Sequence, residues 1–379
     1  MKLKMNKRTS LRGTSDASKI MFDPFVPKQS IKLCENSRPT EWIASPRRIV
    51  LNVKDHEVAR NDDTLYWTTV SWKNLKQASA FFLVISFALL ITSCETIINP
   101  DLENAEPVLV VDAWLNNLPQ EQTIKLSQTQ PYFDNTNPAG ESAAIVTLTN
   151  ETEGRTFVFN EEGTTGNYKW IPSSPTDSIG KYQDVFSLQV QVGADEFLAT
   201  AKLGRSPKID SITFRFEEGN SFIPDYYLGS FWATDFSGQG DRYWIKTYRN
   251  DTLLLKPSDI NTAYDAGFSA GGNIDGVTFI TPIREGISPF DTDDDGNLLS
   301  PYNIGDSVYV EIHSISLQAF TFLAEVQVQT DRPGGFAELF SSPFANVSTN
   351  IVNANPNGKK AVGFFNVGQI KGLGKRFVE

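Results

Sequence analysis

From residue 107 onward, the chain repeats short runs in which apolar and polar residues alternate. Between residues 107 and 206 these runs include PVLVVDAWL, AAIVTLTN and VFSLQVQV. Clusters of Gly, Pro, Asn and Asp separate them at spacings of roughly ten residues, which is typical of antiparallel sandwiches. The pattern therefore predicts an immunoglobulin- or transthyretin-like β-sandwich of about seven strands over residues 107–206.

A second β-rich domain is predicted over residues 207–379. It contains the alternating runs IDSITFRF, SVYVEIHSI and AVGFFNVG, with a loop-rich stretch over residues 256–305 between the first two. Residues 317–329 form the one predicted helix, because Phe320, Leu323 and Val326 recur near helical spacing. The expected fold class is mainly β: two β-sandwich-like domains, the second with one helix and a long loop-rich insertion.

An uncharged apolar run, ASAFFLVISFALLI, occupies residues 78–91. Its 14 residues would reach about 21 Å as a helix, which is short of a hydrocarbon core of about 30 Å. Lys73 and Lys76 precede it and a Cys follows, as in a bacterial signal peptide. The alternative is a buried core segment.

The last residue of this run and the three that follow it, Ile91, Thr92, Ser93 and Cys94, resemble a lipobox. Residues 70–93 are therefore predicted to be a lipoprotein signal peptide, and Cys94 the lipidated first residue of the mature chain. Residues 94–106 are polar and acidic, and they are predicted to tether the lipid to the first domain.

Residues 1–69 do not fit a signal peptide, because a long polar stretch precedes the basic and apolar segments. No Met occurs between Met21 and the apolar run. Our hypothesis is that this stretch reflects a misplaced gene start, with translation beginning near Val70 or Leu75 at a non-ATG codon, or that it is disordered.

The charge balance changes when the leader is removed. The whole chain has a formal net charge of −11, but residues 1–93 hold 15 of the 34 basic and 8 of the 45 acidic residues. This leaves 19 basic and 37 acidic residues, a balance of −18. An acidic chain of this kind is not expected to bind nucleic acid, since phosphates require a basic face.

Few residues capable of thiol or imidazole chemistry remain after Ser93. Residues 94–379 contain one Cys, one His (His313) and no Met. This composition excludes an internal disulfide and a zinc site built from several Cys or His residues. His313 alternates with apolar residues in SVYVEIHSI, so we expect it on the polar face as a surface histidine rather than a catalytic base.

The densest acidic cluster is DTDDDG at residues 291–296. Asp291, Asp293 and Asp295, followed by Gly296, match the opening of a calcium loop. The twelfth position, which usually supplies a bidentate Glu, is Tyr302. A calcium site of another type and a solvated acidic turn are both open interpretations, and no other metal or cofactor is predicted.

Two neighbouring strands are rich in aromatic residues, and Tyr227, Trp232 and Trp244 are the candidates for facing a ligand. The alternative is core packing, which sandwiches commonly use. The sequence has no G-x-S-x-G, H-E-x-x-H or dinucleotide fingerprint, so no catalytic residue is predicted. Carboxylate pairs are too numerous to single one out.

Several segments together resemble one known family. They are the lipobox Cys with PVLVVDAWL, then IKLSQTQPYF with AAIVTLTN, DGNLLSPYNIGDSVYVEIHSIS, and SSPFANVSTNIVNANPNGKKAVGFFNVG. The resemblance is to Bacteroidota lipoproteins grouped as domain of unknown function 4249, and it covers residues 94–379. It implies an outer-membrane lipoprotein, on the surface or periplasmic face, encoded beside a TonB-dependent transporter.

The expected function is that of a non-catalytic accessory or ligand-binding partner of such a transporter, anchored in the outer membrane by acyl chains on Cys94. Two alternatives are kept. One is a carboxylate-based hydrolase of surface glycans, and the other is a structural or adhesive surface lipoprotein.

Overall fold

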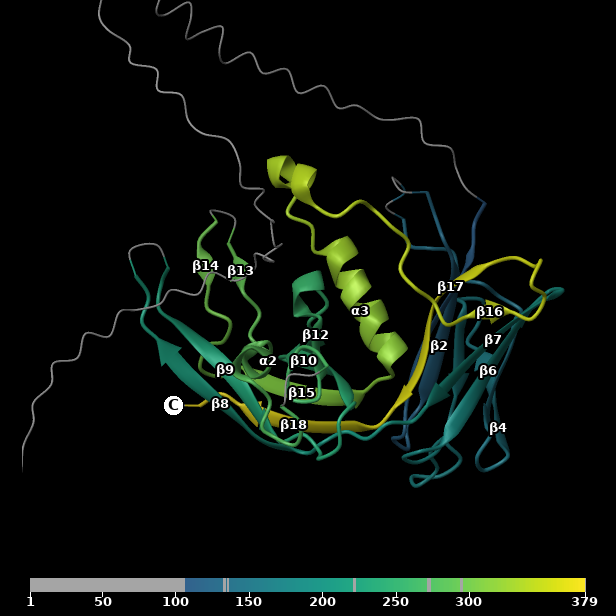
Figure 1. Cartoon of the computed structure of the whole chain (residues 1–379), viewed down its shortest axis with the longest axis horizontal. Helices are drawn as coiled ribbons and strands as arrows, with labels where there is room; N and C mark the ends of the chain where they lie inside the picture. The colour runs from purple at the N-terminus through teal and green to yellow at the C-terminus, as the bar shows by residue number, and fades with distance from the viewer. Residues whose placement is uncertain are drawn as a thin grey trace, which may run out of the picture. The chain divides into compact units, whose positions relative to one another are not determined.

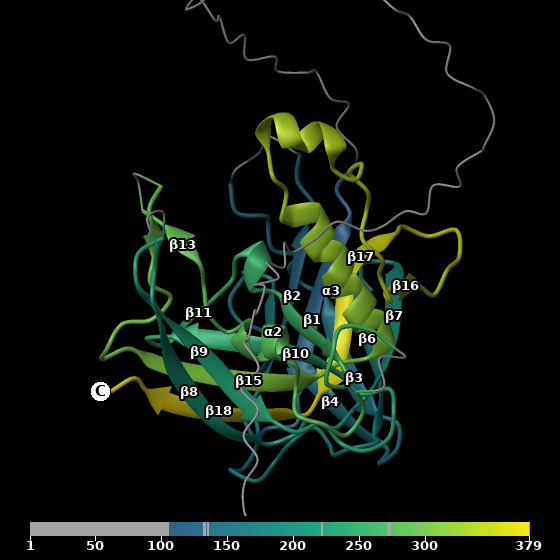
Figure 2. The ribbon, with the colours of Figure 1, turned by 60° about the vertical axis from the view of Figure 1, so that its left-hand side comes forward.

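The computed structural model describes residues 106–378, except 132, 133, 135, 221, 222, 271–273, 294 and 295. Within these residues the chain is mainly β, as predicted, and it builds two large sheets (Figures 1 and 2). The predicted extension, signal peptide and lipobox, with Cys94, lie outside the described residues. Within the described part, no helix is both long and apolar enough to cross a bilayer.

The first sheet has nine strands in the order β16-β7-β6-β3-β4-β5-β2-β1-β17. Seven of them come from residues 107–206, as the alternating runs predict. The strands are β1 (Leu109–Asn116), β2 (Gln122–Gln128), β3 (Ile145–Asn150), β4 (Arg155–Glu161), β5 (Asn167–Trp170), β6 (Val185–Val192), β7 (Asp195–Lys202), β16 (Val352–Asn353) and β17 (Ala361–Gly368).

Alternation along β1 shows why the first sheet has two distinct faces. Leu109, Val111, Ala113 and Leu115 are buried in the core that the strands enclose. The residues between them, including Asp112, point to the other side, because successive side chains of a strand face opposite ways. One face of β1 therefore belongs to the core, and the other is available to the rest of the molecule.

The last strand of the first sheet comes from the far end of the chain. β17 pairs in parallel with β1, with Leu109 opposite Ala361 and Asn116 opposite Gly368. The strands approach closely at Gly363, where an added Cβ would lie 2.1 Å from the Val111 carbonyl oxygen. The sheet therefore crosses the predicted boundary at residue 206, since β16 and β17 arise from the segment assigned to the second domain.

The second sheet follows the order β11-β10-β15-β18, with β12 also paired to β10. A separate hairpin, β8–β9, packs on one face and shares its apolar core. The strands are β8 (Ile209–Glu217), β9 (Tyr226–Ala233), β10 (Arg242–Arg249), β11 (Thr252–Leu253), β12 (Asn261–Tyr264), β15 (Ser307–Ser314) and β18 (Ile370–Arg376).

The loop-rich stretch between β11 and β15 contains short elements. They are η1 (Pro257–Asp259), α2 (Thr281–Glu285), β13 (Asp291–Thr292) and β14 (Leu298–Leu299). The five-residue helix α2 is absent from the sequence prediction, because one helical turn leaves too few residues for a periodic pattern.

The predicted helix is present as α3 (Leu317–Thr330), one residue longer than expected. Ser316 caps it, because its side-chain oxygen accepts a hydrogen bond from the Ala319 N–H (3.0 Å). Ala319 and Leu323 pack against Phe364 of β17, and η2 (Gly335–Phe340) follows the helix. In Figure 1, α3 lies between β17 and the second sheet.

Phe365 tests whether the first sheet depends on β17. This side chain is fully buried in the first core, so Phe365→Ala should lower the free energy of unfolding by about 3–5 kcal/mol. Urea denaturation measures the change. Ile171→Ala, at a 69% exposed position, is the control and should stay within about 0.5 kcal/mol. An equally small effect at both positions would contradict the role given to β17.

Candidate functional site

A cavity of about 360 Å³ lies where β1 and β17 face α3 and β10. Its walls come from both sheets, from α3 and from the segment between β11 and η1. Most of the lining is apolar, and it includes Trp114, Trp244, Leu254, Phe322, Leu323 and Phe364. A concave, mostly apolar cavity with a few polar groups is the usual form of a small-molecule site.

Aromatic rings fix the wall shared by the two sheets. Trp114 of β1 stacks on Phe364 of β17, with ring centroids 5.7 Å apart. Trp114 also meets Trp244 of β10 edge to face at 5.0 Å. Phe322 of α3 completes the cluster, 4.8 Å from Phe364. Because each ring is held by others, this wall is preformed.

Two opposite charges enter the cavity from different sheets. Asp112 comes from the outward face of β1, and Lys246 comes from β10. The Lys246 ammonium lies 4.0 Å from the centroid of the Trp244 ring, a cation–π contact. Among the described residues, no ion pair or side-chain hydrogen bond engages either charge, so both are available to an occupant.

The surroundings of the cavity disfavour the charged forms of both Asp112 and Lys246. Asp112 is accessible through the open side, but the walls remove enough water to raise the pKa of its carboxyl, an effect that Lys246 and Lys125 oppose. Burial likewise lowers the pKa of the Lys246 ammonium, and Glu311 and Asp112 oppose that shift. An occupant that pairs with these groups would offset part of this cost.

A hydrogen-bonded histidine lies beside the cavity on the same face of the second sheet. β10 and β15 place Trp244 opposite His313 and Lys246 opposite Glu311. His313 Nε2 lies 2.8 Å from Glu311 Oε2, and the Tyr248 hydroxyl donates to the same oxygen at 3.2 Å. The His313 side chain is only 15% exposed, so the prediction of a surface histidine is wrong.

The pKa values of this pair move for different reasons. Burial lowers the pKa of His313, and the bond to Glu311 opposes this shift. Burial alone would raise the pKa of Glu311, but the hydrogen bonds from His313 and Tyr248, with the nearby positive charges, outweigh it and lower that pKa. His313 does lie on the predicted polar face, but its neighbour Trp244, 6.2 Å away between ring centroids, packs with Phe322 of α3 and Phe364 of β17, so this face is an interior one.

The three aromatic candidates lie in different places. Trp244 lines the cavity. Tyr227 packs in the core of the second sheet, 4.9 Å from Phe377. Trp232 lies on the outside of the β8–β9 hairpin, where Arg284 stacks 3.9 Å from its ring. The structure therefore brings none of the three together.

Sequence reasoning missed Asp112, Trp114 and Lys246. The alternation in LVVDAWLN does place Asp112 and Trp114 on one face of β1, and RYWIKTYR places Trp244 and Lys246 on one face of β10. Nothing in either run shows that these two faces meet, because their approach depends on the pairing of β17 with β1.

The acidic run at residues 291–296 is described only in part. Asp291 begins β13 and forms an ion pair with Lys256. Asp293 Oδ1 accepts a hydrogen bond from the Asn297 N–H at 2.8 Å. Asp295 lies outside the described residues, so the calcium site stays a prediction.

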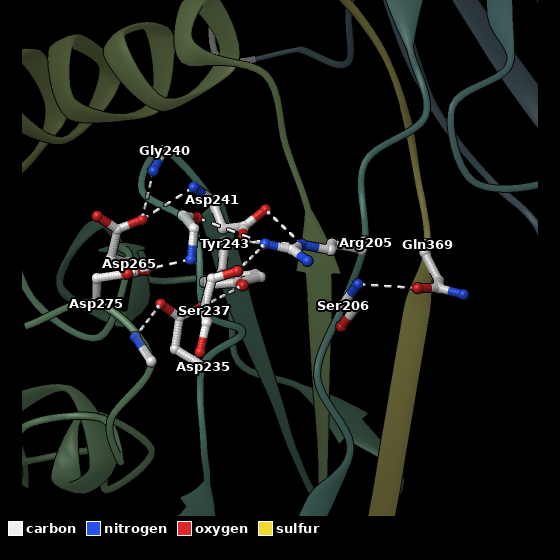
Figure 3. Close-up of polar contacts among 12 residues, drawn as sticks. Arg205, Ser206, Asp235, Ser237, Gly240, Asp241, Tyr243, Asp265, Asp275 and Gln369 are labelled. Carbon is white, nitrogen blue, oxygen red and sulfur yellow. Dashed lines mark hydrogen bonds and ion pairs between the residues drawn. The ribbon is translucent and has the colours of Figure 1, made fainter.

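A second acidic cluster, which sequence reasoning did not find, lies at one end of β10 (Figure 3). Carboxylate oxygens of Asp235, Asp265 and Asp275 lie within 4.8 Å of one another. An all-oxygen set of this kind suits hard cations such as Ca²⁺. Asp235 follows β9, whereas Asp265 and Asp275 lie in the connection between β12 and α2, so no metal-ligand spacing in the sequence reveals the three together.

Hydrogen bonds explain most of this cluster as loop structure. The Tyr243 hydroxyl donates to Asp235 at 2.5 Å, and the Gly240 N–H donates to Asp265 at 2.7 Å. The Gly238 N–H donates to Asp275 Oδ2 at 3.1 Å. Among the described residues, Asp275 Oδ1 is buried with no hydrogen-bond partner. Among the described residues of the cluster, that oxygen is the buried one that has no hydrogen-bond donor.

The environment of His313 predicts a pH dependence of stability. Because burial holds its folded-state pKa below 6.5, the unfolded chain binds the proton more tightly, and stability falls as pH drops below about 6.5. The slope from this residue is at most about 1.4 kcal/mol per pH unit. Urea unfolding between pH 7 and pH 5 measures it, with His313→Gln as the comparison. Identical slopes for both proteins would contradict the buried, uncharged histidine.

Comparison with known proteins identifies the family. The family described as Domain of unknown function (DUF4249) matches residues 95–372. No curated protein sequence matches the chain. Sixteen chains of solved structures match, and one of them is the crystal structure of bovine butyrophilin. Its sequence identity is 7%, and the match covers 55% of this chain and 92% of the butyrophilin chain. Its TM-score of 0.17 supports no conclusion about fold or function. The family match spans most of the chain, which therefore belongs to the DUF4249 family.

Proposed function

We propose that this protein binds a small amphiphilic molecule in the cavity between its two sheets. In this proposal acyl chains on Cys94 hold the protein at the outer membrane, where it serves as a non-catalytic accessory of a TonB-dependent transporter. The observation that carries the proposal is the cavity itself, because its preformed apolar walls include two charged groups that form no ion pair or side-chain hydrogen bond among the described residues.

The cavity suggests the chemical class of the ligand. Its volume of about 360 Å³ falls within the usual range for small-molecule sites, roughly 300–1,000 Å³. The aromatic and aliphatic walls would bury an apolar body. Lys246 would receive an anionic or acceptor group, and Asp112 would receive a donor on the same polar end of the ligand.

The other charged residues of the lining are already engaged. Lys256 is paired with Asp291, and Asp259 Oδ2 accepts a hydrogen bond from the Lys256 N–H at 2.8 Å. His313 is bound to Glu311 rather than to a nucleophile. These contacts favour binding over catalysis. The glycan hydrolase stays the alternative, and turnover of a glycan by the purified protein would support it.

Lys246 provides the direct test of ligand binding. Anilinonaphthalene sulfonate is a suitable probe, because it combines aromatic rings with an anion and fluoresces in apolar surroundings. Lys246→Met should weaken its binding about tenfold or more, as expected when a charge-assisted hydrogen bond worth about 1.5–3 kcal/mol is lost. Asp112→Asn should strengthen binding, because it removes a negative charge near the sulfonate. Fluorescence titration measures both effects.

Lys208→Met is the matched control, since Lys208 is exposed and does not line the cavity. It makes the same change in net charge and should leave the affinity unchanged. If Lys246→Met and Lys208→Met bind the probe equally well, the cavity is not the binding site.

The role beside a transporter has its own test. The protein should co-purify with a barrel partner from detergent-solubilised membranes. A monodisperse monomer would contradict that role.

A further inference from the structure

The segment after α3 exposes three large apolar side chains next to one another. On η2, Phe336 is 77% exposed, Leu339 75% and Phe340 80%. The rings of Phe336 and Phe340 lie 5.6 Å apart. We call these three residues the apolar knob. Scattered apolar residues on a surface are ordinary, but a contiguous group on one short element marks an interaction site.

The knob is held in place by contacts beneath it. Arg332 forms an ion pair with Glu338 and donates to the Ser342 carbonyl oxygen at 2.9 Å. Its guanidinium also stacks 3.9 Å from the Phe344 ring. The Gly334 N–H donates to Glu338 Oε2 at 3.3 Å. The charges of this loop are therefore paired with each other, while the three apolar side chains point outward.

The knob lies at the end of the domain where the first strand begins. After the knob, the chain runs back along α3, where the Ala345 N–H donates to Gln329 Oε1 at 3.0 Å. It then reaches β17, where the Thr349 hydroxyl donates to the Gly363 carbonyl oxygen at 2.7 Å. Gly363 is near the start of β17, which runs parallel to β1. Both views show η2, the short helix beyond α3, above the sheets at this end (Figures 1 and 2).

The length of the preceding chain limits what can cover the knob. The tether of residues 94–106 has 13 residues and spans at most about 45 Å. An acylated Cys94 would therefore hold the start of β1 within about 45 Å of the bilayer, which leaves this end of the domain able to reach it. This step rests on the anchor in the proposed function. An exposed apolar tip beside a paired Arg332 and Glu338 suits the boundary between headgroups and acyl chains, where apolar burial drives insertion.

We infer that Phe336, Leu339 and Phe340 insert into the interfacial layer of the membrane that holds the lipid anchor. The anchor and the knob then form two separate attachments at one end of the domain. Two attachments orient the protein, whereas a flexible tether alone would let it rotate. The opposite end, where β5 ends near Ile171, faces away from the membrane, because β5 and β1 each run antiparallel to β2.

Depth-dependent fluorescence quenching tests this inference on the acylated protein. A polarity-sensitive fluorophore is attached at Phe340→Cys or at Ile171→Cys. The protein is reconstituted into phosphatidylcholine–phosphatidylglycerol vesicles that contain a lipid with a spin label near the headgroup. The label at residue 340 should be quenched at least twofold more than the label at residue 171. Ile171 is the matched control because it is an exposed apolar residue at the opposite end. The protein without an added cysteine is a control for labelling at Cys94. Acylation of Cys94 should block this labelling.

The outcomes separate the knob from the anchor. A chain that does not sediment with the vesicles contradicts the anchor, and with it this inference. A chain that sediments while its label at residue 340 stays as unquenched as the label at residue 171 contradicts the inference alone. A label that is shielded in native membranes but not in vesicles indicates a protein partner for the knob and also contradicts insertion.

Discussion

The parallel pairing of β1 with β17 is the contact on which the rest of this structure depends. It joins the first described strand to one that begins more than two hundred residues later. Phe365 of β17 enters the first core, whereas Phe364 points into the aromatic wall of the cavity. The chain then continues through Gln369 into β18 of the second sheet, and the Gln369 side chain accepts a hydrogen bond from the Ser206 N–H at 2.9 Å. One strand pair therefore supports both sheets and the space between them.

The same pairing brings the two charges of the cavity into one space, and among the described residues neither forms an ion pair or a side-chain hydrogen bond. Asp112 and Lys246 belong to different sheets, and each is fixed by its own strand register. Helix α3 and the aromatic cluster keep the two sheets apart at this point and exclude part of the water. Opposite charges that line one mostly apolar cavity favour a ligand that contacts both, and this is the physical basis of the proposed binding function.

Local features of the fold could be predicted from the sequence, and pairings between distant segments could not. Alternation located the seven strands of residues 107–206, and helical spacing located α3 to within one residue. The boundary expected at residue 206 is crossed by β16 and β17, because alternation does not reveal which strands pair. His313 shows the same limit: its polar face was predicted, but its burial depends on α3 and the first sheet. Cys94 and its lipobox lie outside the described residues and stay a prediction.

A crystal structure of the protein with anilinonaphthalene sulfonate bound would test the central claim most directly. The account predicts the rings against Trp244 and Phe364, the sulfonate within hydrogen-bond distance of Lys246 Nζ, and β1 still paired with β17. A probe bound only outside the space between the sheets, or a cavity filled by side chains of the protein, would contradict it.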